Sequence, residues 1–348
     1  MRKLTYLLVT LIALSLAACG DTVNNYTVQG AVSFEDGFAA VAPNVAELRY
    51  GDEVATAFVY TRYDGAQIML TCYHIFGGDF DKSLLSLRFY GDADFAYGAE
   101  LIGYDSAYDV AVLLVESPPQ RDFADLRASC RFTPAVGCAT LAIGNSSGAG
   151  LAAFGGILSD AERIVTKDGR CLAVSATTSA VNAGCSGCPV VDAEGNFLGI
   201  GFAQQIVSDD NGRPVVDANY MIPAEIADAV YSLAVARYAD GASGQLPYVS
   251  NVISLTMNTS TLKASAQSVA LGFTGSFTPS GFTVTDAFGG TVCSELIKGD
   301  VIVSIGDRAA DGYIAMTAAL YKATGEEKGV NMGYMRGGSL METSISFR

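Results

Sequence analysis

The sequence has no tryptophan, a single histidine and few basic residues. Only 21 lysines and arginines stand against 36 aspartates and glutamates, a net charge of −15 that argues against nucleic acid as a partner. The missing tryptophan, beside 17 tyrosines, 17 phenylalanines and 38 glycines, favours a β-rich chain with many turns over a helical bundle. Half of the 348 residues are apolar, which excludes general disorder and suffices for two domains with hydrophobic cores.

The N-terminus carries a separate pattern. Arg2 and Lys3 precede about fifteen mostly apolar residues, as in an export signal, and the run is short for a helix that spans a bilayer. The following LAAC, residues 16–19, resembles the bacterial lipobox, which implies that residues 1–18 are removed and that Cys19 is lipidated. We therefore expect an exported lipoprotein of the bacterial cell envelope, held on a membrane by Cys19, with residues 19–35 as a tether. The alternative is a permanent anchor or a core helix.

Seven cysteines remain after Cys19, which is an odd number. In an exported protein we expect disulfides, with at least one thiol free or paired between chains. The sequence does not fix the pairs, although Cys130 and Cys138 could close a short loop.

Short apolar or alternating runs, separated by Gly, Asp and Asn, fill the chain up to about residue 202. They predict strands at 53–60, 66–72, 86–90, 99–103, 110–115, 138–143, 171–175, 190–191 and 197–202. This spacing favours a β-barrel or sandwich over alternating strands and helices. Ile226, Val230 and Leu233 recur at helical spacing before a Gly/Ser linker, which predicts a domain boundary at 240–245.

Three residues could form a catalytic set. Ser186 lies between glycines in NAGCSGCPVV, and a serine hydroxyl becomes a nucleophile when an imidazole takes its proton and a carboxylate orients that imidazole. His74 ends a predicted strand and Asp109 immediately precedes another. Taken singly, each has an ordinary explanation as a packed, surface or turn residue. Their order in the chain, His then Asp then Ser, is that of chymotrypsin-type enzymes.

Five blocks along the chain resemble the trypsin-fold serine proteases, and among them the HtrA/DegP group. The blocks are TCYHIF, LIGYDSAYDVAVLLV, AIGNSSGAGLAAFGGILSDAER, NAGCSGCPVVDAEGNFLGI and NYMIPAEI. The resemblance implies a mostly β fold with a chymotrypsin-like double β-barrel at residues 36–240. It assigns Ser186 as nucleophile, His74 as general base and then acid, and Asp109 as the residue that orients His74. It implies no cofactor, and it implies a homo-oligomer, commonly a trimer.

Two further positions bear on catalysis. Gly184 permits a turn in which its own N–H and that of Ser186 converge on one point, an oxyanion hole. Ala180 stands six residues before Ser186, where trypsin-type enzymes carry an acid. Because that acid is missing, the resemblance implies a small or medium aliphatic side chain before the cleaved bond, in place of Lys or Arg.

The cysteines around Ser186 leave an alternative open. Cys72, His74, Cys185 and Cys188 form a Cys-x-His plus Cys-x-x-Cys set, formally a four-ligand zinc site. A histidine that binds metal cannot also act as the base. Zinc leaves Asp109 unexplained, and a disulfide from Cys72 to Cys188 or Cys185 would account for the same cysteines, so we expect no metal.

Residues 249–348 resemble a PDZ domain, a β-rich domain with one or two helices. The ALGF stretch, residues 270–273, is similar to the loop whose N–H groups hold a peptide carboxylate, LIKGDVIVSIGD resembles the central strand pair, and a helix is expected at 312–324. The resemblance implies that Leu271, Gly272 and Phe273 bind peptide C-termini by strand addition. The alternative is an unspecified β-rich domain that packs against the barrels.

Together these patterns predict a membrane-anchored serine endopeptidase of HtrA type that acts on unfolded or damaged exported proteins. A second hypothesis comes from a different class of protein: an inactive protease-fold lipoprotein that binds peptides or acts as a chaperone, because the cysteines distort the loop around Ser186.

Overall fold

The structure is a computed structural model that describes residues 33–208, 214–246, 252–258, 260–261, 263–326 and 328–347. By its internal contacts the chain divides into two units, Met1–Ser33 and Phe34–Arg348. The predicted export signal, Cys19 and most of the predicted tether therefore lie outside the described residues. No helix in the described ranges is both long and apolar enough to cross a membrane.

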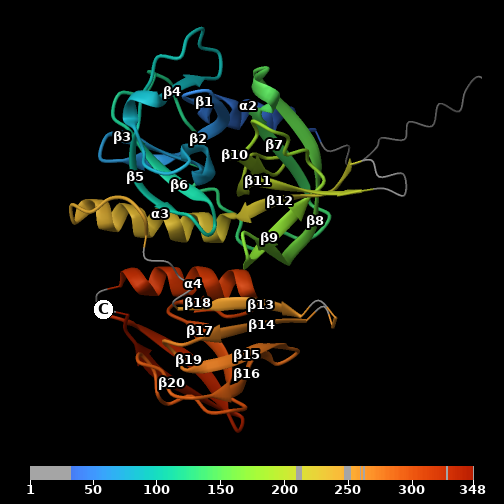
Figure 1. The fold of residues 1–348 in the computed structure, drawn as a ribbon, viewed down its shortest axis with the longest axis vertical. Coiled ribbons are helices and arrows are strands. Elements are labelled where there is room, and N and C mark those ends of the chain that lie inside the picture. The colour runs from blue at the N-terminus through green and yellow to red at the C-terminus, as the bar shows by residue number, and fades with distance from the viewer. Residues whose placement is uncertain are drawn as a thin grey trace, which may run out of the picture. The chain divides into compact units, whose positions relative to one another are not determined.

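Six antiparallel strands form the first sheet, in the order β4-β1-β2-β3-β6-β5 (Figure 1). The strands are β1 (Val45–Tyr50), β2 (Glu53–Tyr63), β3 (Ala66–Cys72), β4 (Leu85–Phe89), β5 (Glu100–Asp105) and β6 (Val110–Val115). The mostly apolar β3 and β6 are neighbours in the interior of this sheet and are almost wholly buried. Their register sets Cys72 opposite Val110. The chain therefore leaves β3 toward His74 at the same end of the sheet at which it enters β6 from Asp109.

Six more strands form a second barrel. They are β7 (Ala139–Asn145), β8 (Leu151–Lys167), β9 (Arg170–Thr177), β10 (Cys188–Val191), β11 (Phe197–Ser208) and β12 (Pro214–Pro223). Their order is β12-β11-β10-β7-β8-β9, and β12 also pairs with β9, which closes the barrel. Because β10 begins at Cys188, the loop that carries Ser186 lies directly before it.

Helices and short 3-10 turns flank the two barrels. Helix α2 (Glu35–Val41) packs on the turn after β10, where a Cβ on Gly37 would lie 2.6 Å from the Ala193 carbonyl. Helix α3 (Ala224–Ala239) follows β12 directly. The 3-10 turns are η1 (Ala42–Asn44), η2 (Tyr73–Phe76), η3 (Lys82–Leu84) and η4 (Ser146–Gly148).

The C-terminal region is also mostly β. Its strands are β13 (Ser254–Asn258), β14 (Lys263–Ser268), β15 (Phe273–Thr278), β16 (Gly281–Ala287), β17 (Val301–Ile305), β18 (Arg308–Ala309), β19 (Val330–Arg336) and β20 (Ser339–Ile345). Helix α4 (Tyr313–Gly325) lies between β18 and β19 in the sequence. Leu255 of β13 pairs with Cys171 of β9, so one continuous sheet runs from the second barrel into this region.

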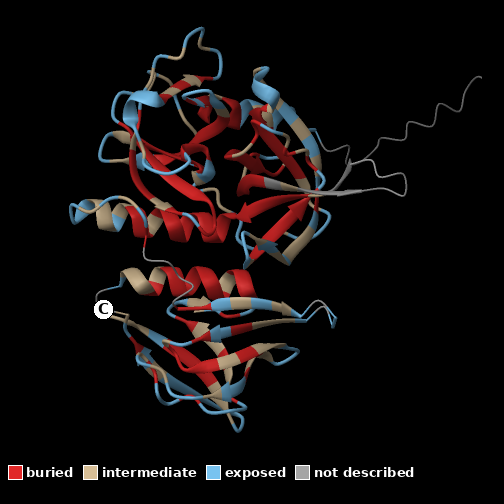
Figure 2. Cartoon of the chain, in the orientation of Figure 1, coloured by how far each residue is buried: buried red, intermediate tan, exposed pale blue. Residues whose placement is uncertain are grey.

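Aromatic and aliphatic side chains fill the core, which Figure 2 shows in red along the strands and on α3 and α4. Since the chain has no tryptophan, tyrosine and phenylalanine supply the largest fully buried side chains, among them Tyr60, Phe58, Phe197 and Tyr321. Ring pairs such as Tyr60 with Phe197, at 5.5 Å between centroids, hold the two barrels' aromatic residues together.

The predicted fold class, mostly β with few helices, is confirmed. The predicted strands 66–72 and 110–115 coincide with β3 and β6, and the others differ from the observed strands mainly at their ends. The sequence did not reveal β1, β8 and β12. The predicted boundary at 240–245 follows α3 directly, and the proposed division into a barrel domain and a domain from 249 onward stays a prediction.

Candidate active site

His74 and Asp109 form a hydrogen-bonded pair at the end of the first sheet. His74 Nδ1 lies 2.6 Å from Asp109 Oδ2, and the His74 backbone N–H donates to Asp109 Oδ1 at 2.7 Å. Both oxygens of the carboxylate are therefore used on one residue, which fixes the imidazole ring. The His74 side chain remains 44% exposed, so its outer nitrogen is accessible to a reactant, while Asp109 is buried.

Asp109 is held as a carboxylate. Burial raises its pKa, but the hydrogen bonds and positive charges of His74 and Lys167 outweigh burial and bring the pKa below its ordinary value. Lys167 Nζ lies 2.7 Å from the same Oδ2 that contacts His74. Asp109 also has φ of +62°, a strained conformation for a non-glycine residue. Strain of this kind persists where the surroundings over-determine it, as the three hydrogen bonds from His74 and Lys167 do at this carboxylate.

The Ser186 loop packs on the strands that lead to His74. The Thr56 N–H donates to the Ser186 carbonyl at 3.0 Å, and the Thr56 hydroxyl donates to the Gly184 carbonyl at 2.8 Å. A Cβ on Gly187 would lie 2.3 Å from Thr71 Oγ1 and 2.9 Å from the Cys72 nitrogen. Only glycine allows this approach, which brings the residue after Ser186 against the chain two residues before His74.

Ser186 itself is half-buried, and its hydroxyl makes no hydrogen bond to His74 within the described ranges. Catalytic hydrogen bonds in ligand-free proteases are often long and shorten when substrate binds. The structure thus joins two members of the predicted triad directly and connects the third through the packing of its loop.

The turn around Gly184, predicted to form the oxyanion hole, is a position that requires glycine. Gly184 has φ of +85°, and a Cβ there would lie 2.1 Å from the Asn145 carbonyl. Among the described residues, no protein group accepts the N–H of Gly184 or of Ser186. Two unpaired donors next to one serine can bind an oxyanion.

Ala180 is half-buried and precedes Val181, whose N–H donates to Asn219 Oδ1 at 3.1 Å. Gln204 bridges Asn219 and Asn182 through its side-chain amide. These side chains are uncharged, so none of them offers a carboxylate to a basic substrate residue.

The seven cysteines in the described part are all free thiols, so none of the expected disulfides is present there. Small residues make room for the two beside Ser186: a Cβ on Gly201 would lie 2.7 Å from Cys188 Sγ, and one on Gly144 would lie 2.9 Å from Cys188 Cβ. Burial raises the pKa of Cys188 well above its usual value, and that of Cys185 to about 11.

The four-ligand zinc set of the sequence is not assembled. Within the described ranges, Cys72, His74 and Asp109 bring their side-chain atoms within 4.8 Å of one another, and neither Cys185 nor Cys188 joins them. Burial, followed by the charge of Asp109, raises the pKa of Cys72 well above its usual value. The His74–Asp109 hydrogen bond accounts for the closeness of the other two residues.

The three residues predicted to bind peptides lie at the start of β15. Leu271 and Phe273 are fully buried, and Gly272 has φ of +72° with the backbone of Gly289 and Gly290 packed against it. Their side chains therefore belong to the core, and only backbone groups of this loop could face a ligand.

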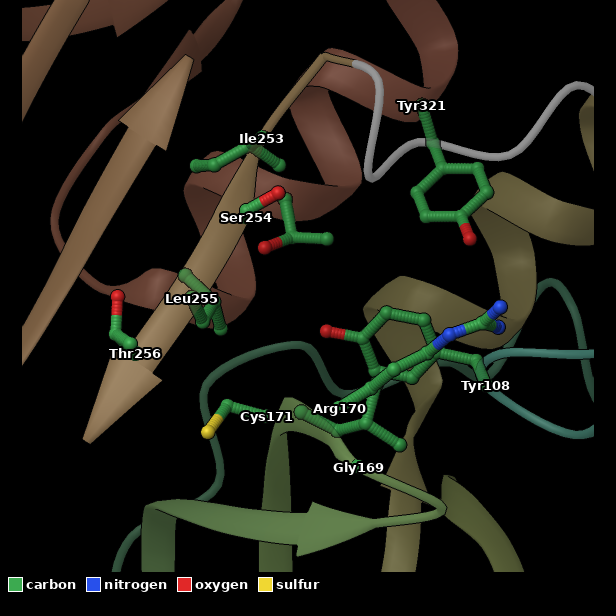
Figure 3. A pocket seen from close by; sticks show the side chains of 11 residues that line it. Tyr108, Gly169, Arg170, Cys171, Ile253, Ser254, Leu255, Thr256 and Tyr321 are labelled. Atoms are coloured by element: carbon green, nitrogen blue, oxygen red, sulfur yellow. The ribbon is translucent and has the colours of Figure 1, made fainter.

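A separate cavity of about 370 Å³ lies next to Asp109. Figure 3 shows Tyr108, Arg170 and Tyr321 on one side of it and the strand from Ile253 to Thr256 on the other. Tyr321 donates to Asp105 Oδ2 at 2.6 Å. The residue before Asp109 and the turn after Lys167 thus both line this cavity.

Sequence reasoning missed two residues of the site. Lys167 lies 58 positions from Asp109 in an ordinary Lys-Asp-Gly-Arg turn, and no local signal marks it. Thr56, which holds both carbonyls of the Ser186 loop, lies in the apolar run of β2. A polar residue within such a run was the available signal for Thr56.

Comparison with known proteins agrees with this geometry. Residues 55–200 match the family described as trypsin-like peptidase domain. The serine protease Do-like HtrA of Lactococcus lactis subsp. lactis (strain IL1403) is 28% identical over 273 residues, which are 76% of this chain and 63% of that protein. Its counterpart in Lactococcus lactis subsp. cremoris (strain MG1363) is 27% identical over the same shares. The match thus spans less than two thirds of the length of these relatives.

Solved structures show the same fold. The HtrA-type protease AlgW with a decapeptide superposes with a TM-score of 0.53 at 19% identity, over 91% of this chain and 99% of that chain. The same protease with a tripeptide gives a TM-score of 0.52 at 20% identity, over 90% and 96%. The predicted trypsin-like fold and the HtrA resemblance are confirmed. Residues 55–200 therefore match a trypsin-like peptidase domain, and the chain is similar in sequence and fold to HtrA serine proteases.

Proposed function

We propose that this protein is a serine endopeptidase of HtrA type with Ser186, His74 and Asp109 as its catalytic residues. The observation that carries the proposal is the double hydrogen bond of Asp109 to His74, at the Nδ1 and at the backbone N–H. That arrangement directs the accessible Nε2 outward and stabilises the imidazolium that forms when His74 takes a proton.

The reaction proceeds through an acyl-enzyme. Ser186 Oγ attacks the substrate carbonyl while His74 accepts its proton, and the N–H groups of Gly184 and Ser186 stabilise the oxyanion. His74 then donates the proton to the leaving amine. Water attacks the ester with His74 again as base, and Ser186 is released.

The uncharged side chains near Ala180 support a preference for small or medium aliphatic residues before the cleaved bond. Unfolded or damaged exported proteins are the substrates that we propose. Peptide C-termini would bind the region from residue 249 onward, at Leu271, Gly272 and Phe273. A membrane anchor on Cys19, a location in the cell envelope, and a homo-oligomer, with the trimer as the family precedent, complete the proposal.

Covalent labelling tests the activity. The purified chain is incubated with a fluorophosphonate probe, which reacts with activated serines, and the modified peptide is located by mass spectrometry. We expect labelling at Ser186 that is lost in Ser186→Ala and strongly reduced in His74→Ala, whereas Ser147→Ala, in a neighbouring turn, retains it. A chain that degrades no unfolded protein and resists the probe is inactive, and the peptide-binding or chaperone hypothesis replaces this one.

A further inference from the structure

Strand β14 occupies one edge of β15 in the C-terminal region. The two strands are antiparallel, with Ala266 opposite Gly275 and Ser268 opposite Phe273. The other edge of β15 pairs with β16. A peptide that binds by strand addition needs an unpaired edge, because it supplies one half of the ladder. Both edges of the strand that starts at the ALGF loop are therefore taken by the chain itself.

Backbone groups of the ALGF loop, residues 270–273, also form hydrogen bonds within the chain. The Leu271 N–H donates to Ser268 Oγ at 3.0 Å, and Ser268 is fully buried. The carbonyls on either side of Leu271 are also used, since Ala270 accepts from Val292 N–H and Gly272 accepts from Phe288 N–H, both at 2.9 Å. A serine hydroxyl at the end of β14 thus takes the amide that a carboxylate oxygen would need.

Tyr313, the first residue of α4, connects β14 to β15. Its hydroxyl donates to the Ala264 carbonyl at 2.8 Å and accepts from the Phe277 N–H at 3.5 Å. The side chains that β14 turns inward are small. Ala266 and Ser268 are fully buried and Ala264 is half-buried, whereas Lys263 and Gln267 are exposed.

We propose that β14 is a built-in ligand of the C-terminal region, and that an external peptide binds there only by displacing residues 263–268. The inference rests on the proposed peptide-binding role of this region. The ligand class follows from the strand that now fills the site. It is an extended peptide with a free C-terminal carboxylate and small side chains at alternate positions, as at Ala264, Ala266 and Ser268.

The test compares two tryptophan variants of the full chain. In Ala266→Trp the large side chain cannot fit at a fully buried position, so β14 leaves the edge. Gln267→Trp is the matched control, because the same side chain at the exposed neighbour leaves β14 in place. Since the chain has no other tryptophan, the emission of each variant reports whether its own tryptophan faces water.

The probe is the fluorescein-labelled hexapeptide KASAQS with a free carboxylate, the sequence of β14, and anisotropy measures its binding. We expect Ala266→Trp to bind it at least about ten-fold more tightly than the wild type or Gln267→Trp, because an occupied site lowers apparent affinity by its closed fraction. An equal affinity of the probe for the wild type, Ala266→Trp and Gln267→Trp overturns the proposal. So does a folded Ala266→Trp chain with a solvent-exposed tryptophan that does not bind.

Hydrogen exchange of the wild type gives a second readout that needs no variant. Because β14 also pairs with β13, probe binding must be accompanied by lost protection of those amides among residues 266–268 that bond to β15, and binding that leaves them protected overturns the proposal. Should Ala266→Trp lack a cooperative unfolding transition, the smaller Ala266→Leu gives the same comparison. Neither readout uses peptidase activity, so failure of fluorophosphonate labelling at Ser186 would refute the endopeptidase and leave this result standing.

Discussion

Lys167 and His74 both contact the carboxylate of Asp109. Its ammonium lies 2.7 Å from Asp109 Oδ2, and the charged or titratable groups around it are Asp109, His74 and the Cys72 thiol. A cation at this place opposes the positive charge that His74 acquires during catalysis. Lys167 therefore sets how strong a base the pair provides.

Replacing Lys167 by methionine tests that role. Without the cation Asp109 loses one of the two residues that lower its pKa, so the carboxylate that orients His74 becomes protonated at a higher pH. We expect the acid limb of the pH profile of kcat/KM to move to higher pH in Lys167→Met and to stay in place in Lys167→Arg. An acid limb that is identical in both variants would mean that Lys167 only packs against Phe202, whose ring centre is 5.0 Å away.

Gly184 is the second residue with a sharp expectation. A Cβ there meets the Asn145 carbonyl at 2.1 Å and is strained at φ of +85°. Gly184→Ala should displace one oxyanion donor and lower kcat by about 10²- to 10³-fold. Gly241→Ala is the matched control, since Gly241 has φ of +79° and nothing within 4 Å of the added carbon. Equal losses in both variants would assign the effect to backbone strain.

His74 and Asp109 could be selected from the sequence for two reasons. They lie at the end of one predicted strand and the start of another, and the blocks TCYHIF and LIGYDSAYDVAVLLV that contain them resemble trypsin-fold proteases. Lys167 could not be selected. Only the closed second barrel brings the β8–β9 turn back to the first sheet, and barrel closure depends on pairings between distant strands.

At the scale of elements, β3 and β6 were predictable with their bounds because β6 is a continuous apolar run, β3 is a mostly apolar run, and turn residues flank both. Strand β8 was not, since its 17 residues include two glycines, charged residues and a mostly half-exposed pattern. Its strand conformation comes from pairing with β7 and β9, which local sequence does not show.

The hydrogen bonds of Tyr313, at the start of α4, with Ala264 of β14 and Phe277 of β15 give a prediction at this scale. Tyr313→Phe removes the hydroxyl that links the Ala264 carbonyl to the Phe277 N–H. We expect the free energy of unfolding to fall by about 1–2 kcal/mol, measured in urea, since both hydrogen bonds of the hydroxyl are lost. Tyr90→Phe, at a residue that is 42% exposed, should change stability by less than about 0.5 kcal/mol. An unchanged free energy of unfolding in Tyr313→Phe would show that these hydrogen bonds do not stabilise the fold.

At the scale of the whole molecule, Asp228 of α3 collects partners from three distant segments. It accepts from Tyr60 OH at 3.1 Å, Arg127 Nε at 2.9 Å and Lys322 Nζ at 2.8 Å. Asp228→Asn leaves the two cations without a countercharge. We expect a loss of roughly 2 kcal/mol in denaturant unfolding, below the ~3–5 kcal/mol of a fully buried pair, because Arg127 and Lys322 are partly solvated.

Acid should weaken the fold. Burial raises the pKa values of Asp109, Asp228 and Asp300, but their cationic partners outweigh burial and bring all three below the usual value. Carboxyls of this kind contribute stability above the unfolded-state pKa and lose it as pH falls through the folded-state pKa. The loss of these three ion pairs should therefore lower the midpoint of thermal unfolding below about pH 4. A midpoint that does not fall below that pH would contradict these ion pairs.

The close packing of α2 on the turn after β10 has a mechanical consequence. Gly37 touches the Ala193 carbonyl so closely that no side chain fits, and Gly195 lies against Ala40 and Val41 from the other side. A pull on the chain ahead of Phe34 would thus be transmitted to two places, strand β8 through the Phe34 ring beside Gly155 and the turn after β10 through Gly37. Force applied to the N-terminal segment would therefore reach the strand that follows Ser186 through that turn.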